Sequence, residues 1–380
     1  MKHPSLLLII AVSFLSCGGH SSGGQAETGD TVFFKYAKLI TVVKYRNHTD
    51  VSIKNPWKKG KVLHQYRLIP YDATQPQQTE HQSVTAGLTV VKVPLQRSVV
   101  FTSVHAALLE QLHAEKQVAG VADLRYMKVP YVKEGVNGGK IIDCGEGMSP
   151  MVEKIIDAEA DAILLSPFEN SGGYGKLEEI DIPLIECAEY MEQSPLARAE
   201  WIRFYGMLYG KEHEADSLFA HVDSSYHNLK ELAATSTKKP KVLMDKQTGS
   251  VWYVPGGRST IGQMLKDAQC RYPFADDEHS GSLPLPFEAI LEKAGDSDIW
   301  LFRYDAPQPI TRSSLMKEQP GYSQLRPAQI GQLYGCNVTT SMFYEEAPFR
   351  PDLLLQDFIQ ILHSDIPNMP PLRYYHKVEN

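Results

Sequence analysis

The pattern of hydrophobic and polar positions divides the chain into parts with different secondary structure. Residues 31–93 contain runs rich in β-branched and aromatic residues, such as TVFFKYAKLITVVKY and KVLHQYRLIPY, separated by turn-forming segments. Runs of this composition favour β-strands, and the breaks between them favour turns. We therefore expect residues 31–93 to form an antiparallel, β-rich extension ahead of the main body.

From residue 94 onward, short apolar runs alternate with segments of helical periodicity. The runs SVVF, VAGVA and AILLS indicate buried strands, whereas HAALLEQLHAE, SPMVEKIIDAEA and YGKLEEID indicate helices. Strands that alternate with helices are typical of a parallel sheet with crossover helices. Residues 94–192 are therefore expected to form one Rossmann-like α/β lobe.

A long helical region follows this first lobe. Ser194 is a good N-cap for a helix that starts at Pro195, and Gly210 is expected to end that helix. Apolar residues then recur at helical spacing over about residues 211–234, which predicts a rod of roughly 35 Å. We expect residues 193–236 to join two lobes.

The remaining residues, 237–380, repeat the alternating pattern. Strands are predicted at KVLMDK, SVWYVPGG and DIWLFRY, and helices at TIGQMLKDAQ, PFEAILEKAG, RPAQIGQLY and PDLLLQDFIQILHSDI. The predicted fold is therefore α/β, with two Rossmann-like lobes of parallel sheets joined by a long α-helix, plus an N-terminal β-rich extension.

The first 30 residues carry an export pattern. The basic Lys2 precedes an apolar run over residues 6–15, which is too short for a permanent membrane span and predicts a signal peptide over residues 1–17. The ending FLSC resembles a bacterial lipobox with Cys17 as the lipidated residue, although an ordinary signal peptide with an incidental cysteine is the alternative. Residues 18–30 are rich in Gly and Ser and would form a flexible tether. The resulting expectation is a periplasmic protein, lipid-anchored to a membrane of a Gram-negative bacterium.

Composition and motifs narrow the function further. The 380 residues are 43% hydrophobic and carry a formal net charge of -7, without the basic excess that nucleic-acid binders usually show. The chain has no P-loop, G-x-S-x-G, H-E-x-x-H or C-x-x-C motif. The scattered histidines predict no dedicated metal site, and we expect no catalytic residues and no cofactor. Besides Cys17 there are four cysteines, which could be free thiols or form one bridge: Cys144, Cys187, Cys270 and Cys336.

One phrase occurs twice. VEKIIDAEADAILLSPF at residues 152–168 and FEAILEKAGDSDIWLFRY at residues 287–304 both place a Glu before an apolar pair, an Asp and an apolar run. Glu153 and Glu288 would both lie in the first turn of a helix, where the helix dipole stabilises a carboxylate by about 0.3–1 kcal/mol. That effect explains a Glu in each helix but not the matching phrases.

The order and spacing of several segments resemble the substrate-binding proteins of bacterial ABC importers for iron-siderophores, haem and cobalamin. The resemblance covers about residues 94–366 and rests on PLQRSVVF, both repeated phrases, PLARAEWIRFYGMLYGKEHEAD, VWYVPGG and RPDLLLQDFIQILHSDI. It implies a monomeric, non-enzymatic protein with a rigid helix between its lobes. It also implies that Glu153 and Glu288 meet arginines on the two membrane permease subunits. This chain lacks a proline found before the strand in many relatives, where it has AEAD and GDSD.

Ligands of α/β sheets bind beyond the carboxyl ends of the strands. The residues at those positions are aromatic and cationic, which suits large, flat or anionic chelates. The candidate ligand-binding residues are His105, Arg125, Tyr126, Phe168 and Tyr190 in the first lobe, and Trp252, Tyr253, Arg258, Arg303, Tyr304 and Tyr344 in the second.

The arginines favour an iron-siderophore complex as the ligand. Haem and cobalamin remain alternatives, because His105 and Tyr126 could ligate haem iron and Trp252 with the tyrosines would suit a corrin. A protein of another class, a secreted metal-dependent enzyme using His105 and Glu169, is the more distant alternative. No nucleophile–base pair supports that last reading.

Overall fold

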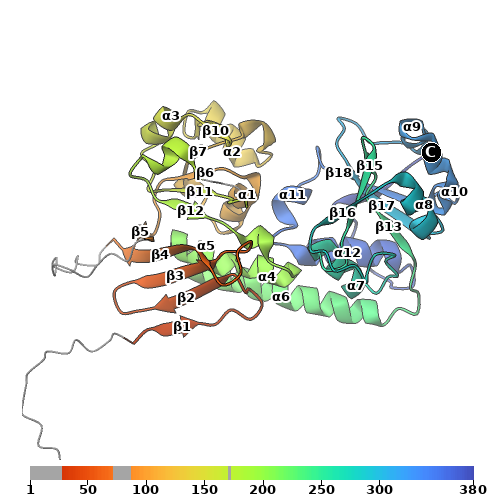
Figure 1. The fold of residues 1–380 in the computed structure, drawn as a ribbon, viewed down its shortest axis with the longest axis horizontal. Helices are drawn as coiled ribbons and strands as arrows, with labels where there is room; N and C mark the ends of the chain where they lie inside the picture. Colours follow the sequence, from red (N-terminus) through yellow and green to blue (C-terminus); the bar gives the residue numbers. More distant parts are fainter. Residues whose placement is uncertain (1–27, 72–86, 170–172) are drawn as a thin grey trace, which may run out of the picture.

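Figure 1 shows the computed structural model, which describes residues 28–71, 87–169 and 173–380. An N-terminal sheet lies beside the first of two α/β lobes, and one long helix runs along the base of both lobes (Figure 1). The predicted fold class is therefore confirmed. The expected signal peptide, Cys17 and most of the tether lie outside the described residues.

The N-terminal extension is a five-stranded sheet. Its strands follow the order β1 (Asp30–Val32), β2 (Ile40–Lys44), β3 (Thr49–Lys54), β4 (Val62–Pro70) and β5 (Leu88–Val93). Strands β1 to β4 are antiparallel, but β5 runs parallel to β4, so the antiparallel prediction is wrong for the last strand. The buried side chains of this sheet join the same hydrophobic core as α1 and α5.

Lobe 1 contains a wholly parallel sheet. Its strands lie in the order β12 (Leu184–Glu186), β11 (Ala162–Leu165), β6 (Ser98–Val100), β7 (Val118–Val121) and β8 (Ile142–Asp143). The lobe's helices are α1 (Ser103–Gln111), α2 (Pro130–Asn137) and α3 (Val152–Asp157), and β9 (Gly145–Glu146) pairs with β10 (Ser149–Pro150). Strands β6, β7 and β11 are buried throughout, as their apolar runs predict for a sheet covered on both faces.

One predicted helix of lobe 1 is much shorter in the structure. The segment YGKLEEID forms only the 3-10 turn η3 (Gly175–Glu178). Gly175 has φ of 56°, and Pro183 disfavours helical backbone at the residue before it. These two residues leave space for a single turn.

The connection between the lobes consists of α4 (Pro195–Glu200), α5 (Ile202–Tyr209) and α6 (Glu212–Ala234). Ser194 caps α4 by accepting from the backbone N–H of Ala197 at 3.1 Å, and Gly210 ends α5 in a left-handed conformation, as predicted. The predicted single helix before Gly210 is instead two helices that meet at the buried Trp201. The predicted rod is confirmed as α6, which has 23 residues.

Lobe 2 has a sheet of order β13 (Val242–Met244), β17 (Ile299–Tyr304), β18 (Leu333–Asn337) and β19 (Tyr375–Lys377). Only β19 is antiparallel to its neighbour. A second sheet of β14 (Gln247–Thr248), β15 (Val251–Pro255) and β16 (Ser282–Leu285) is antiparallel. The expected parallel pairing therefore holds for β13, β17 and β18, whereas β19 and the second sheet are antiparallel.

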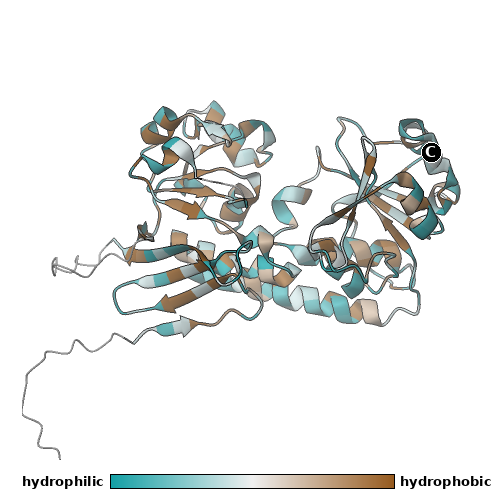
Figure 2. Cartoon of the chain, viewed as in Figure 1, coloured by the Kyte–Doolittle hydropathy of each residue, from teal (hydrophilic) through white to brown (hydrophobic). Residues whose placement is uncertain are grey.

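The helices of lobe 2 are α7 (Thr260–Asp267), α8 (Phe287–Ala294), α9 (Arg312–Glu318), α10 (Arg326–Gln329), α11 (Phe343–Glu346) and α12 (Pro351–Leu362). The predicted helix at RPAQIGQLY is only the short α10, because Gly331 adopts φ of 68° and the chain then enters β18. Figure 2 shows hydrophobic strands inside both lobes and a largely hydrophilic α6.

No helix in the described ranges combines the length and the apolar character that a membrane span requires. The four cysteines of the described part, Cys144, Cys187, Cys270 and Cys336, are free thiols.

Candidate functional site

The carboxyl edge of the lobe 1 sheet faces lobe 2. Ser103, the first residue of α1, follows β6 closely and donates a hydrogen bond to Glu345 Oε1 in α11 at 3.2 Å. Phe349 packs edge-on against Tyr205 of α5, with 5.6 Å between ring centroids. Helix α11 accordingly lies between the two lobes in Figure 1. We refer to this boundary, where the carboxyl edge of the lobe 1 sheet meets lobe 2 and where α/β sheets bind their ligands, as the interlobe cleft.

One hollow of the cleft belongs to lobe 1. It has a volume of about 460 Å³ and lies at the carboxyl ends of β6, β7 and β11. Thr102, Asp123, Ser166 and Phe168 contribute to its lining, and the ring of Phe168 is exposed. Its volume is within the range of roughly 300–1,000 Å³ that is usual for small-molecule sites.

A second, smaller hollow lies where α4 meets lobe 2. It has a volume of about 170 Å³ and is lined by two guanidinium groups, Arg198 and Arg303, beside two aromatic rings, Phe343 and Tyr344. Apolar residues of α7 and α12 complete it. We call this hollow the cleft floor.

Arg303 of the cleft floor is firmly held. Its Nε and Nη2 atoms donate to the two carboxylate oxygens of Asp245 at 2.8 and 2.7 Å. Burial alone lowers the pKa of Arg303, but the Asp245 charge outweighs this effect and raises it. The guanidinium also lies 5.8 Å from the centre of the Phe343 ring. Such a bidentate pair fixes the orientation of the side chain.

Arg198 belongs to a buried polar cluster under the cleft. Glu189 of η4 (Glu189–Met191) lies 3.2 Å from His105 Nε2, accepts from Tyr205 at 3.3 Å, and lies 4.0 Å from Arg198 Nη2. Burial would raise the pKa of Glu189, but His105 and Arg198 outweigh it and lower the pKa. Burial lowers the pKa of Arg198, which the Glu189 charge opposes. A guanidinium nevertheless stays charged in proteins.

Four predicted ligand residues lie in or beside these hollows. Phe168 lines the lobe 1 hollow, and Arg303 and Tyr344 line the cleft floor. The hydroxyl of Tyr190 donates to the carbonyl oxygen of Pro167, next to Phe168. The structure therefore places candidates from both lobes in or beside these two hollows, and their contact with a ligand stays a prediction.

Three other predicted ligand residues are buried in the protein core. His105 and Trp252 have no exposed surface, and Tyr304 is 5% exposed. Trp252 packs against Trp300, with ring centroids 5.5 Å apart, and donates to the carbonyl oxygen of Met244. The prediction that these residues contact a ligand is wrong, because their side chains fill the interior of their lobes.

The remaining candidates are exposed but line neither hollow. Arg125 stacks on Tyr126 at 4.7 Å and lies 3.5 Å from Glu146. Arg258 pairs with Glu278 at 2.6 Å, and Tyr253 is exposed on β15. A role in ligand binding stays a prediction for these four residues.

The two repeated glutamates occupy matching positions. Glu153 is the second residue of α3 and Glu288 the second residue of α8, so both lie in a first helical turn. Both are exposed, one on each lobe. Their contact with a permease stays a prediction.

Sequence reasoning missed three residues of the site: Glu189, Arg198 and Asp245. A signal existed for Arg198, because it lies within the otherwise apolar helix start PLARAE, where Leu196, Ala197 and Ala199 are all buried. A charged side chain at such a position usually has a buried partner. The partner itself, nine residues earlier, could not be identified from the sequence.

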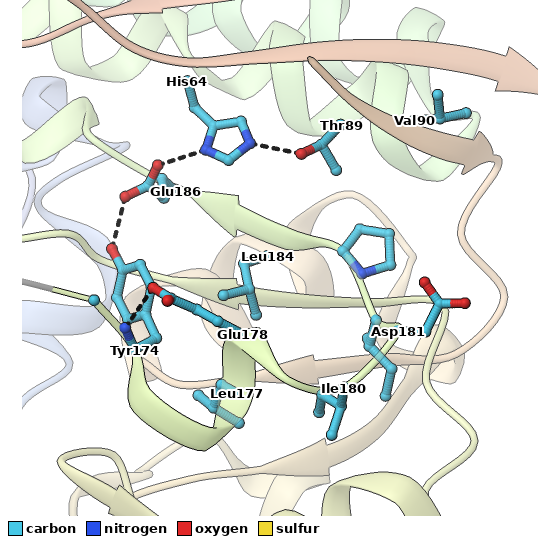
Figure 3. A pocket seen from close by; sticks show the side chains of 13 residues that line it. His64, Thr89, Val90, Tyr174, Leu177, Glu178, Ile180, Asp181, Leu184 and Glu186 are labelled. Carbon is cyan, nitrogen blue, oxygen red and sulfur yellow. Dashed lines mark hydrogen bonds and ion pairs between the residues drawn. The ribbon is translucent and has the colours of Figure 1, made fainter. Parts of the chain in front are cut away.

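A third hollow, of about 730 Å³, lies outside the cleft, between the N-terminal sheet and lobe 1 (Figure 3). His64 joins the two parts, with Nδ1 2.8 Å from Glu186 Oε2 and Nε2 2.7 Å from Thr89 Oγ1. Tyr174 donates to the other oxygen of Glu186 at 2.7 Å. Because the polar atoms of His64 and Glu186 bind one another and their neighbours, this network fastens the extension to lobe 1.

No group of three or more His, Cys, Asp or Glu side chains in the described part of the chain is arranged to hold a metal ion.

Comparisons with known proteins identify relatives of this chain in sequence and in fold. A curated relative, an uncharacterized lipoprotein of Methanocaldococcus jannaschii, is 27% identical over 90% of this chain and 84% of its own. A periplasmic heme binding protein of Pseudomonas aeruginosa superposes with a TM-score of 0.59 at 15% identity, over 75% of this chain and 99% of its own. A siderophore binding protein of Vibrio cholerae, solved with Fe3+–Desferal, has a TM-score of 0.53 at 16% identity, over 72% and 99%.

These structural matches show that the two-lobed fold is shared. The model of one protein family, described as periplasmic binding protein, matches residues 99–338, which cover most of lobe 1, the connecting helices and lobe 2 as far as the end of β18. The chain belongs to this periplasmic binding protein family.

Proposed function

We propose that this protein is the solute-binding component of an ABC importer that captures a metal chelate, an iron-siderophore complex, in its interlobe cleft. The observation that carries this proposal is the cleft floor, where Arg198 and Arg303 lie beside Phe343 and Tyr344. Guanidinium groups bind anionic oxygens through charge-assisted hydrogen bonds, and aromatic rings cover flat apolar surface. Solved proteins of the same fold that bind heme or a siderophore support the ligand class.

Haem and cobalamin remain the alternative ligands within the same function. A secreted metal-dependent enzyme finds no support, because His105 has no exposed surface for a substrate or a metal. The protein is proposed to act without a cofactor of its own.

The partners follow from the same proposal. Glu153 and Glu288, exposed on different lobes, would dock on arginines of the two permease subunits, and each monomer would bridge both subunits. Lipidation at Cys17 would hold the protein at a membrane outside the cytoplasm, in the periplasm of a Gram-negative bacterium. The curated lipoprotein relative supports the anchored, extracytoplasmic location.

A titration of the purified chain with a panel of chelates tests the proposal. The panel contains ferrioxamine B, ferric citrate, haem and cyanocobalamin, each of which has a visible absorption band. We expect ferrioxamine B or ferric citrate to bind with one molecule per chain and to quench the intrinsic fluorescence of the protein. Binding of haem or cyanocobalamin alone would establish an alternative ligand, and binding of none would contradict the proposed function.

A further inference from the structure

Arg198 has unused hydrogen-bonding capacity. A guanidinium carries five N–H donors, yet none from Arg198 makes a hydrogen bond to a residue in the described parts of the chain. Its Nε is buried without a partner there, and its ion pair is with Glu189 at 4.0 Å. Glu189 already accepts from Tyr205 and lies within hydrogen-bonding distance of His105. Buried polar groups are usually satisfied, so this exception calls for a partner.

Arg303, the other arginine of the cleft floor, differs from Arg198 in having a hydrogen-bonded carboxylate partner. Both oxygens of Asp245 accept from Arg303, so this guanidinium already has its carboxylate. Arg350 and Arg373 likewise make two hydrogen bonds each to one carboxylate, those of Asp352 and Glu346. Arg198 lines the same hollow as Arg303, with 22% of its side chain exposed, and lacks such a partner among the described residues.

We infer that Arg198 binds a free carboxylate of the captured ligand, so the ligand is a carboxylate-bearing chelate. The floor's volume of about 170 Å³ is below the roughly 300 Å³ of the smallest usual ligand pockets. It therefore receives one arm of the chelate, while the rest lies in the wider cleft. The planar fork of a guanidinium matches a carboxylate in two parallel hydrogen bonds. The rings of Phe343 and Tyr344 cover the apolar part of the arm.

This inference rests on the proposed function and narrows its ligand class. The test compares the affinities of three full-length proteins for a set of probes. These are the wild type, Arg198→Gln, which removes the charge, and Arg198→Lys, which keeps the charge but lacks the planar guanidinium group. Arg271→Gln is the matched control, because Arg271 pairs with Lys241, just before β13, and with Asp298, outside the lobe 1 hollow and the cleft floor. The probes are ferric citrate and haem, which carry free carboxylates, and ferrioxamine B and haem dimethyl ester, which carry none. Metal-free citrate is a fifth probe, read by thermal shift.

We expect a carboxylate probe to bind the wild-type chain and Arg271→Gln equally, and Arg198→Gln about 10- to 100-fold more weakly. Arg198→Lys should lie between them, and the esterified or carboxylate-free probe should bind the wild type more weakly than its counterpart. Equal binding of a carboxylate probe to wild type and Arg198→Gln would overturn the inference and leave the proposed function standing. Binding of ferrioxamine B or haem dimethyl ester without binding of either carboxylate probe would have the same two consequences.

Metal-free citrate separates the remaining outcomes. If no chelate binds but citrate raises the unfolding temperature of the wild type and not of Arg198→Gln, the carboxylate site stands and the proposed chelate function fails. If neither citrate nor any chelate binds, both are overturned. Circular dichroism of each variant shows whether a loss of binding comes from unfolding; if Arg198→Gln does not fold, Arg198→Lys decides by the same comparison.

Discussion

Ser103 and Glu345 connect the two lobes directly: the Ser103 hydroxyl donates to Glu345 Oε1 at 3.2 Å across the interlobe boundary. Glu345 is 1% exposed, and its other oxygen has no hydrogen-bond partner among the described residues. Together with α6, which runs beneath both lobes in Figure 1, this contact resists separation of the lobes. It also leaves a buried carboxylate dependent on a single donor.

Ser103→Ala is expected to lower the free energy of unfolding by about 1–3 kcal/mol, because it leaves the Glu345 carboxylate buried and without a donor. Adding Glu345→Gln should restore part of this loss, since a neutral amide is easier to bury than an unpaired charge. Urea denaturation of the two single variants and the double variant measures the coupling free energy between Ser103 and Glu345. Strictly additive effects of the two substitutions would show that the two side chains are not coupled.

Arg303→Ala should destabilise the fold by about 3–5 kcal/mol, because it leaves Asp245 buried without its cationic partner. Asp245 is 6% exposed and has little contact with solvent in the folded protein. Arg258→Ala is the control: Arg258 and its partner Glu278 are both exposed, and its loss should cost less than about 1 kcal/mol. Similar unfolding midpoints for the two variants would show that the Arg303–Asp245 pair adds no stability.

Charge reversal at both repeated glutamates, Glu153→Arg with Glu288→Arg, should abolish uptake in cells that depend on this importer. Arginines facing permease arginines repel one another, and such like-charge contacts cost several kcal/mol. Chelate affinity of the purified variant should not change, and stability should fall by about 1 kcal/mol per site at most. Glu134→Arg with Glu231→Arg, at exposed positions on α2 and α6, is the control. Normal uptake by the first variant would remove the docking role.

Stability should fall at acidic pH in a way that depends on Glu189. Its pKa is lowered because His105 and Arg198 outweigh the effect of burial. A carboxylate with a lowered folded pKa adds stability above its unfolded pKa of about 4.3, and this is lost as the pH falls through the folded pKa. Glu189→Gln should therefore be less stable near neutrality but show a flatter decline between about pH 5 and 3. Chemical denaturation across this range measures the free energy of unfolding at each pH, and Glu292→Gln, at an exposed position, is the control. Parallel pH profiles for Glu189→Gln and wild type would show that Glu189 does not cause the loss of stability at acidic pH.

Glu200 fastens the start of the extension to the interlobe helices. Its carboxylate accepts from the backbone N–H groups of Lys35, Tyr36 and Ala37 at 2.7, 2.7 and 2.8 Å. Glu200→Ala should therefore speed tryptic cleavage after Lys35 by about 10-fold or more, because the segment opens more often. Glu231→Ala removes an exposed carboxylate of α6 and should cleave at the wild-type rate. Unchanged cleavage of the Glu200 variant would show that other contacts hold the segment.

The architecture was accessible from the sequence because it is encoded in local periodicity. The strand–helix alternation, the rod of α6 and the first-turn positions of Glu153 and Glu288 all depend on residues close together in the chain. Sequence reasoning failed locally where a glycine or a distant strand decided the outcome, as at η3 and at β15, which pairs outside the parallel sheet.

The binding site depended on contacts between distant segments. Trp252 and Tyr344 are both aromatic residues expected near strand ends. Trp252 is buried because it packs against Trp300, whereas Tyr344 is exposed. Arg303 acquires Asp245 from 58 residues away, whereas Arg198 receives no comparable partner among the described residues. Side-chain type and local pattern determine which elements form, but only tertiary packing decides which charges are neutralised inside the protein and which remain for a ligand.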